Sequence, residues 1–173
     1  MGLNLKPVTV KPLTLKPLTW GIIVALITFA VDQGFKHVLL EGFDFANQAP
    51  LRLLPFLDIT LAWNKGVSYS LFTANSDVER YALLGVYAVA TLAFIIWMLR
   101  AKRLVTTLAL GFLIGGASGN ALDRVIYGAV ADFFHIHFGG FTPFGVFNLA
   151  DMAIVAGVAL LLYESLFVKD SIE

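Results

Sequence analysis

Four long apolar stretches, separated by shorter polar segments, dominate the pattern of the chain. A helix that crosses a bilayer needs roughly 20 mostly apolar residues, and residues 20–40, 81–99, 104–122 and 147–167 meet that requirement. No small-x-small cleavage site follows the first stretch, so we interpret it as a retained anchor and not as a signal peptide. The pattern predicts four membrane-spanning helices.

The segments between the spans and at the ends of the chain have different characters. Residues 41–77 hold short apolar runs broken by proline and glycine, which predict two or more short strands. Residues 125–146 are rich in glycine toward their end and are predicted to form a loop. Residues 6–20 repeat a five-residue unit that begins Lys-Pro, and proline at every fifth position prevents a regular helix. We therefore divide the chain into a basic tail at 1–19, a four-span domain at 20–168 and a short tail at 169–173.

The third span carries glycines at regular helical spacing. Gly111, Gly115 and Gly119 fall at i, i+4 and i+8, so they form a smooth stripe on one face of a helix. Such a stripe lets a neighbouring helix approach closely. We interpret it as a packing surface and not as a site.

Composition narrows the class of protein and the chemistry open to it. The 173 residues are 58% hydrophobic and only 14% charged, whereas a soluble domain is about a quarter charged; the mean hydropathy is +0.81. Twelve basic residues balance twelve acidic ones, so there is no large positive field to attract nucleic acid. The chain has no cysteine, which excludes disulfides, thiolate catalysis and cysteine-based metal sites.

Basic residues in the short connections predict the orientation. Lys and Arg are enriched in cytoplasmic loops, and the turn Arg100-Ala101-Lys102-Arg103 between the second and third spans is the strongest such marker. Four spans place both termini on the same side as this turn. We expect both termini to be cytoplasmic.

Polar residues that a bilayer would exclude gather toward the other, external end of the spans. A carboxylate in the bilayer centre costs roughly 2.5–3.5 kcal/mol on insertion scales, so such residues often mark sites. The residues in question come from separate parts of the chain: Asp32, Asn64, Asn120, Asp123, Arg124, Asp132, Asn148 and Asp151. Their convergence at one depth predicts a functional site there.

Several chemistries could use these surroundings. A Ser–Lys pair of Ser68 or Ser70 with Lys65 is conceivable, although none of the serines lies in a nucleophile elbow. His135 and His137 could bind a metal weakly, but two histidines without a third ligand make a poor zinc site. We expect neither a metal nor a cofactor.

A pair of carboxylates is the most attractive candidate. If Asp132 and Asp151 lie a few ångströms apart, they cannot both ionise easily and share one proton. One then draws a proton from water while the other donates to the scissile carbonyl, and the pair titrates as a unit. The alternative, which the residues alone leave open, is that these acids only cap helices or tie loops.

Five stretches, in this order, resemble one known family. They are Asp32-Gln33 with Lys36, Trp63 to Gly66, Gly115 to Arg124, Val130 to Phe133 and Phe147 to Asp151. The chain resembles the bacterial lipoprotein signal peptidases, or signal peptidase II, over roughly residues 20–168. The proline repeat lies outside this resemblance.

The resemblance implies a fold, a substrate and a set of site residues. The fold is a mainly α membrane protein, a four-transmembrane-helix bundle with a small extracytoplasmic β-cradle and an external loop. The enzyme is an aspartyl endopeptidase of the bacterial cytoplasmic (inner) membrane, acting near the extracytoplasmic face on diacylglyceryl-modified prolipoproteins and cutting just before the lipidated cysteine. Asp132 and Asp151 match the catalytic pair. The residues that line and order the site match Asp32, Asn64, Asn120, Asp123, Arg124 and Asn148. The expected partners are the prolipoprotein and membrane lipids, with no nucleic acid, and we expect a monomer.

Two other classes of function remain as alternatives. A small proton-coupled transporter or channel would also place acids in its spans, but it predicts polar residues over the full membrane depth. A non-catalytic membrane adaptor predicts that replacing Asp132 or Asp151 by Asn leaves function intact.

Overall fold

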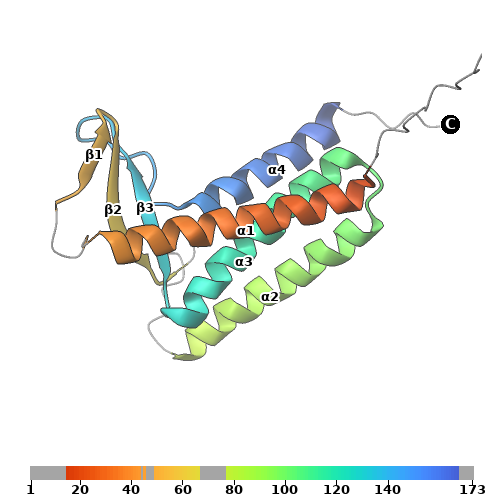
Figure 1. Ribbon diagram of the computed structural model, residues 1–173, viewed down its shortest axis with the longest axis horizontal. Coiled ribbons are helices and arrows are strands. Elements are labelled where there is room, and N and C mark those ends of the chain that lie inside the picture. The colour runs from red at the N-terminus through yellow and green to blue at the C-terminus, as the bar shows by residue number, and fades with distance from the viewer. Residues whose placement is uncertain (1–14, 44, 46–48, 67–76, 168–173) are drawn as a thin grey trace, which may run out of the picture.

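Four long helices form the body of the protein in the computed structural model, which describes residues 15–43, 45, 49–66 and 77–167. They are α1 (Pro17–Gly42), α2 (Asp77–Arg100), α3 (Leu104–Ile126) and α4 (Leu149–Phe167). All four are long and apolar enough to cross a bilayer, and they lie side by side with a small sheet at one end (Figure 1). The four-helix membrane fold expected from the sequence is confirmed. Most of the N-terminal tail, the C-terminal tail and both serines of the Ser–Lys alternative lie outside the described residues.

Helix α3 lies at the centre of the bundle and packs against each of the other three helices. The glycine stripe makes this packing possible: a Cβ on Gly111 would meet the carbonyl oxygen of Gly21 in α1 at 2.5 Å, and one on Gly115 would meet that of Ala25 at 2.6 Å. Helix α4 approaches the neighbouring face of α3 in the same way, because a Cβ on Gly116 would lie 2.6 Å from the carbonyl oxygen of Ala150. The predicted packing role of the stripe is confirmed, and the residue that follows Gly115 extends it to α4.

The sheet is antiparallel, with the order β1 (Leu51–Leu54), β2 (Leu57–Asn64), β3 (Val130–Ile136). Residues 41–77 supply the two strands β1 and β2, as the broken apolar runs predicted. The third strand lies within residues 125–146, which the sequence pattern assigned to a loop. The glycines and proline that suggested a loop follow β3, so they did not reveal the strand before them.

The C-terminal end of α1 packs on this sheet. Leu39 of α1 joins Ile59, Ala131 and Phe133 of the strands in one buried cluster, and Phe35 stacks on Phe134 at a centroid distance of 5.3 Å. These contacts fix β3 against the end of the bundle. As a result, Asp132 of β3 lies close to the ends of α3 and α4.

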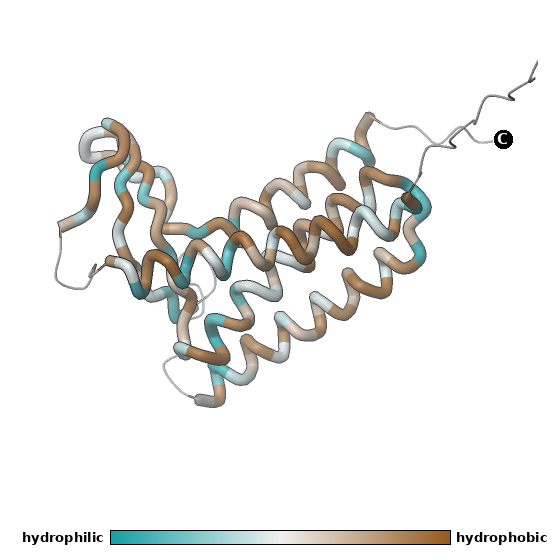
Figure 2. Tube along the Cα trace, viewed as in Figure 1, coloured by the Kyte–Doolittle hydropathy of each residue, from teal (hydrophilic) through white to brown (hydrophobic). Residues whose placement is uncertain are grey.

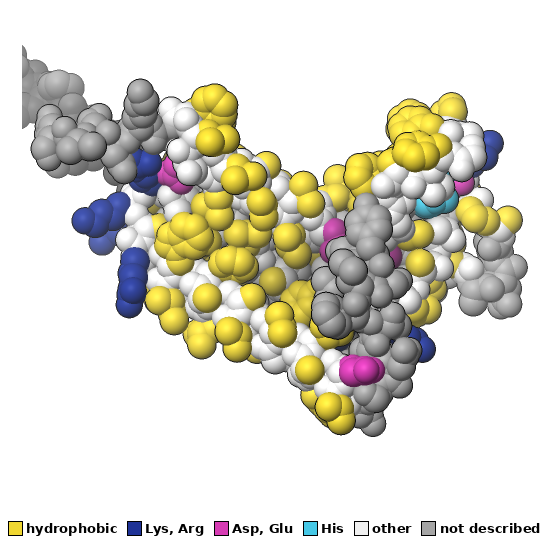
Figure 3. Space-filling model, turned by 180° about the vertical axis from the view of Figure 1, so that it is seen from behind, with side chains coloured by type: hydrophobic (Ala, Val, Ile, Leu, Met, Phe, Trp, Pro, Cys, Tyr) yellow, Lys and Arg dark blue, Asp and Glu magenta, His cyan; other side chains and the backbone are white. Residues whose placement is uncertain are grey.

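The surface separates into apolar and charged zones. Hydrophilic residues alternate with hydrophobic ones in the sheet and gather at the two ends of the helices, with mainly hydrophobic residues between these ends (Figure 2). Hydrophobic side chains spread over the helices, and a group of Lys and Arg side chains lies at the end away from the sheet (Figure 3). We call these the sheet end and the opposite end of the bundle; the opposite end holds the α2–α3 turn.

Candidate active site

The sheet end holds a cluster of polar side chains from all the segments that the sequence singled out. We call it the polar centre: Asp32, Lys36, Asn64, Asn120, Asp123, Arg124, Asp132, Asn148 and Asp151. All of them except Asn64 and Asp151 are only 1–3% exposed to solvent. All eight predicted site residues therefore lie in one connected network. Lys36 is an additional member, which was part of a matching stretch but was given no role.

The buried amine of Lys36 joins α1 to α3. Its Nζ lies 2.8 Å from Oδ2 of Asp32 and 2.8 Å from Oδ2 of Asp123. The spacing of Asp32 and Lys36 along one helix was the sequence signal for this pair, because residues at i and i+4 share a face. The two buried carboxylates thereby share one positive charge.

The same two carboxylates also tie down the backbone of neighbouring elements. Oδ1 of Asp32 accepts from the backbone N–H of Ala150 at 3.0 Å, and Oδ2 of Asp123 accepts from that of Ala131 at 3.2 Å. Gln33 donates to both carboxylates and to the carbonyl oxygen of Gly119. The start of α4 and the start of β3 are therefore held against α1 and α3.

Asn148 and Asp151 form a reciprocal cap at the start of α4. The side-chain oxygen of Asn148 accepts from the backbone N–H of Asp151 at 2.9 Å, and Oδ2 of Asp151 accepts from the backbone N–H of Asn148 at 3.2 Å. This is a capping box, which satisfies two helix N-terminal donors at once. Asp151 thus does cap a helix, as the structural alternative proposed, but its Oδ1 is turned to Asn120, which donates to it at 2.8 Å.

Asp132 lies on β3, where its two oxygens accept from different amides. Nδ2 of Asn148 donates to Oδ1 at 2.6 Å, and Nδ2 of Asn64 donates to Oδ2 at 3.1 Å. Burial, followed by the negative charge of Asp151, raises the pKa of Asp132 from 3.8 to about 7, against the opposing effects of the two amide donors and of Lys36. The carboxyl can therefore gain or lose a proton near neutral pH.

Asp132 and Asp151 form a carboxylate pair joined through Asn148. Asn148 donates its side-chain amide to Asp132 and its backbone N–H to Asp151. Among the described residues, no lysine or arginine lies within ion-pair distance of either carboxylate. Two neighbouring acids that lack a cation have reason to share a proton.

Arg124 binds its own chain. Its guanidinium donates to the carbonyl oxygen of Gly66 at 2.7 Å and to that of Asn120 at 3.2 Å, and it lies 4.7 Å from the ring centroid of Tyr87. The guanidinium therefore holds a backbone carbonyl of the protein itself, just after β2. The residue therefore orders the site from within.

His135 lies in β3 and His137 directly follows this strand, so both are apart from the polar centre. Their ring centroids are 5.6 Å apart, and Nε2 of His137 lies 3.1 Å from Oδ2 of Asp58. In the part of the chain that the structure describes, no three His, Asp or Glu side chains are arranged to hold a metal ion.

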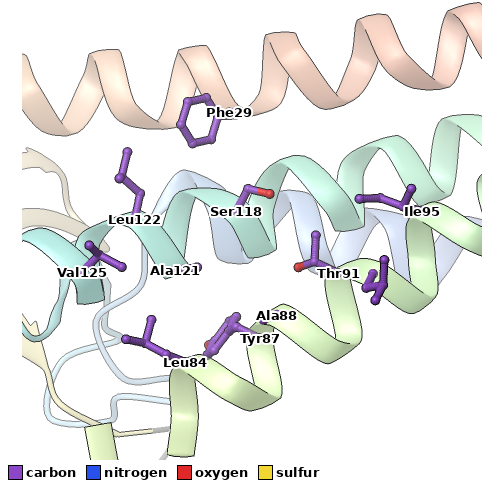
Figure 4. Close-up of a pocket in the computed structure, with 11 residues that line it drawn as sticks. Phe29, Leu84, Tyr87, Ala88, Thr91, Ile95, Ser118, Ala121, Leu122 and Val125 are labelled. Carbon is purple, nitrogen blue, oxygen red and sulfur yellow. The ribbon is translucent and has the colours of Figure 1, made fainter. Parts of the chain in front are cut away.

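An apolar groove of about 600 Å³ runs along the bundle between α1, α2 and α3. Phe29 of α1 closes one side and α2 lines the other (Figure 4). The floor is formed by four residues of α3: Ser118, Ala121, Leu122 and Val125. Tyr87, which contacts Arg124, is among the lining residues. The groove therefore adjoins the polar centre at its sheet end.

Comparison with known proteins gives a consistent result. A family model described as signal peptidase (SPase) II matches residues 24–167. A lipoprotein signal peptidase of Methylocella silvestris is 52% identical over 147 residues, covering 85% of each chain. One from Rhodopseudomonas palustris is 45% identical over 149 residues, covering 84% of this chain and 91% of the other. A solved bacterial membrane enzyme has a TM-score of 0.73 at 25% identity, covering 87% of this chain and 92% of that one.

Proposed function

Because the chain belongs to the signal peptidase II family and is therefore a multi-pass peptidase of the bacterial inner membrane, we propose that it cleaves prolipoproteins by an aspartyl mechanism. Asp132 and Asp151 are the catalytic pair. The substrate is a prolipoprotein whose signal peptide precedes a diacylglyceryl-modified cysteine, and the bond cut is the one just before that cysteine. No metal or covalent intermediate takes part.

One observation carries this proposal: two carboxylates meet at Asn148 with amide donors around them and no cation in contact among the described residues. The raised pKa of Asp132, about 7, supports a shared proton at neutral pH. Asp32 and Asp123 lie in the same network but are paired with Lys36. They therefore serve as supports for the pair.

The chemistry follows from one proton on two carboxyl groups. The ionised carboxylate takes a proton from a water molecule, whose oxygen attacks the scissile carbonyl carbon. The protonated partner donates to the carbonyl oxygen, giving a neutral tetrahedral diol. When the C–N bond breaks, the departing amine takes a proton from the carboxyl that accepted the first one, and the other carboxylate takes back the diol proton. The pair returns to its starting charge.

Amide donors around the pair hold it ready for this step. Asn64, Asn120 and Asn148 fix the carboxylate oxygens from outside, so little reorganisation is needed when charge moves between the two acids. Which acid begins as the base stays open, because the two titrate together.

The position of the pair suits a substrate that arrives within the bilayer. The sheet end lies at the polar ends of four apolar helices (Figures 1 and 2), where water and lipid meet. The groove below it is apolar and adjoins the pair through Tyr87 and Arg124, so an acyl chain of the substrate can stay in an apolar environment. The basic turn at Arg100–Arg103 supports an orientation with both termini cytoplasmic and the active site near the extracytoplasmic face.

Cleavage of a synthetic diacylglyceryl-modified prolipoprotein by the purified enzyme tests the proposal. We expect Asp132→Asn and Asp151→Asn each to lower kcat by about 10³-fold or more, because each removes one proton-transfer group. Asp58→Asn is the matched control: it removes an aspartate from the same sheet, outside the polar centre, and should leave kcat within about threefold. A substrate without the diacylglyceryl group should be cleaved poorly.

Full activity in either folded variant would refute the catalytic pair. If lipoprotein processing in cells also persisted in both variants, the non-catalytic adaptor would be the better description. Equal cleavage of lipidated and unlipidated substrate would remove the assigned substrate class while leaving the peptidase intact.

A further inference from the structure

Lys36 has one contact that charge neutralisation does not explain. Its Nζ lies between the carboxylates of Asp32 and Asp123, and it also donates to Oδ1 of Asn120 at 3.3 Å. The lysine is 3% exposed and Asn120 is 2% exposed. Neither group can therefore exchange this partner for water.

This contact determines which way the amide of Asn120 points. A lysine ammonium has three donors and no acceptor, so the oxygen of Asn120 must face it. Nδ2 of Asn148 donates to the same oxygen at 3.0 Å. The NH₂ group of Asn120 is thereby turned away from Lys36 and donates to Oδ1 of Asp151 at 2.8 Å.

We propose that Lys36 is a positioning residue of the peptidase, which acts through Asn120 to keep an N–H donor on Asp151. This inference rests on the proposed function. If Lys36 is lost, the amide of Asn120 is held by one donor instead of two and can rotate to present its oxygen to Asp151. The side-chain oxygen of Asn120 then faces a carboxylate oxygen of Asp151, and the ionised form of the carboxylate pair becomes less favourable.

Gln33 allows the packing of α1 on α3 to be tested separately from the orientation of Asn120. Its Nε2 donates to Asp32, Asp123 and the carbonyl oxygen of Gly119, which joins α1 to α3 as Lys36 does. Among the described residues, Gln33 makes no hydrogen bond with Asn120. A substitution of Gln33 therefore weakens the same support without releasing the amide.

The charged groups around Asn120 come from four elements. They are Asp32 and Lys36 of α1, Asp123 and Arg124 of α3, Asp132 of β3 and Asp151 of α4. Loss of Lys36 removes a positive charge that lowers the pKa of Asp132. The lost charge and the rotated amide both make ionisation of the carboxylate pair less favourable. The acidic limb of the profile of kcat against pH should therefore move to higher pH.

The experiment compares Lys36→Met with Gln33→Leu in cleavage of the lipidated prolipoprotein, alongside wild type. We expect Lys36→Met to lower kcat by about 100-fold with little change in KM, and to move the acidic limb up by about 1 pH unit. Gln33→Leu should lower the melting temperature while kcat falls by no more than about tenfold and the limb stays in place.

A double-mutant cycle tests the route through Asn120. In an Asn120→Ala background there is no amide to orient, so Lys36→Met should reduce kcat only a fewfold more. If Lys36→Met alone does not fold, Lys36→Met/Asp123→Asn removes one charge of each sign and restores the balance. Its kcat should remain low although its melting temperature recovers.

Any of three results would overturn the inference. The first is a full 100-fold effect of Lys36→Met in the Asn120→Ala background, and the second is recovery of kcat in Lys36→Met/Asp123→Asn. The third is a loss of kcat in Gln33→Leu equal to that in Lys36→Met. The proposed function fails in a different way, through wild type that does not cleave the lipidated substrate or through active Asp132→Asn and Asp151→Asn enzymes.

Discussion

Two polar clusters, each with buried carboxyl groups, lie at opposite ends of the same helices, and the carboxyl groups have different partners in the two. At the opposite end, Glu164 of α4 accepts from the hydroxyl of Thr106 at 2.6 Å and lies 3.6 Å from a guanidinium nitrogen of Arg103. We call these three residues the distal cluster. Its one acid has a hydroxyl donor and a cation, so its charge is compensated.

The polar centre at the sheet end has more acids than its lysine can neutralise. Asp32 and Asp123 share Lys36, whereas Asp132 and Asp151 are surrounded by amides. Amides donate hydrogen bonds but carry no charge, so the binding of a proton by Asp132 and Asp151 remains favourable. Burial of an acid therefore does not by itself indicate an active site. A buried acid without a cation in contact is the more informative feature.

Stability against pH should separate the two kinds of acid within the polar centre. The pKa of Asp132 is raised from 3.8 to about 7, so the folded state binds this proton more tightly than the unfolded state. Its stabilising contribution is fully present below about pH 4 and is lost as pH rises through about 7. At about 1.4 kcal/mol per pKa unit, the loss is at most about 4 kcal/mol.

Thermal melting in detergent between pH 4.5 and 8 measures this effect. Asp132→Asn cannot ionise, so it should melt above wild type at pH 8 and close to it at the acid end. Asp123→Asn, which breaks a buried ion pair, should melt below wild type at pH 8. If both variants shift the melting temperature in the same direction at pH 8, the distinction between paired and unpaired acids is wrong.

The sequence predicted which residues gather but not how they are connected. Span lengths and excluded polar residues were sufficient to predict four helices and the gathering of eight polar residues, because a bilayer imposes strict limits on both. The strand β3 was missed, since its pairing with β2 is a long-range contact that local glycine and proline content does not encode. Its absence from the prediction left Asp132 on a loop.

The contacts of Lys36 and Arg124 could not be predicted from the sequence. Lys36 was visible in the sequence as a lysine one turn after Asp32, but its contact with Asn120 depends on how α1 and α3 pack. The binding of Arg124 to the carbonyl oxygen of Gly66 depends on where β2 ends. Side-chain orientation across elements is a tertiary property, and spacing along one helix does not determine it.

The glycine stripe runs along α3 away from the polar centre and offers a matched pair of substitutions. A Cβ on Gly119 would lie 2.5 Å from Oδ2 of Asp32, whereas one on Gly111 would meet the carbonyl oxygen of Gly21. Each Ala substitution should therefore lower stability by about 1–3 kcal/mol through overpacking. Only Gly119→Ala should also lower kcat, by about tenfold, because Asp32 holds the backbone N–H of Ala150 at the start of α4.

Melting temperatures and kcat for the two variants decide this prediction. Gly85→Ala is the control, since a Cβ there meets nothing within 4 Å. An equal kcat in Gly111→Ala and Gly119→Ala would mean that a shift of Asp32 does not reach Asp151, and the two ends of the stripe would then be equivalent.

The smallest effect is expected at the distal cluster, where an acid has only a structural role. Glu164→Gln keeps an oxygen for the hydroxyl of Thr106 but loses the attraction to Arg103 at 3.6 Å. We expect a loss of about 1 kcal/mol in stability, seen as a small drop in melting temperature, and a kcat indistinguishable from wild type. The same change of acid to amide at Asp132 should lower kcat by about 10³-fold or more. The same kind of substitution therefore has very different effects on kcat at the two ends of the bundle. A tenfold fall of kcat in folded Glu164→Gln would show that the two clusters are coupled through the bundle, and the separation of structural from catalytic acids would then have to be abandoned.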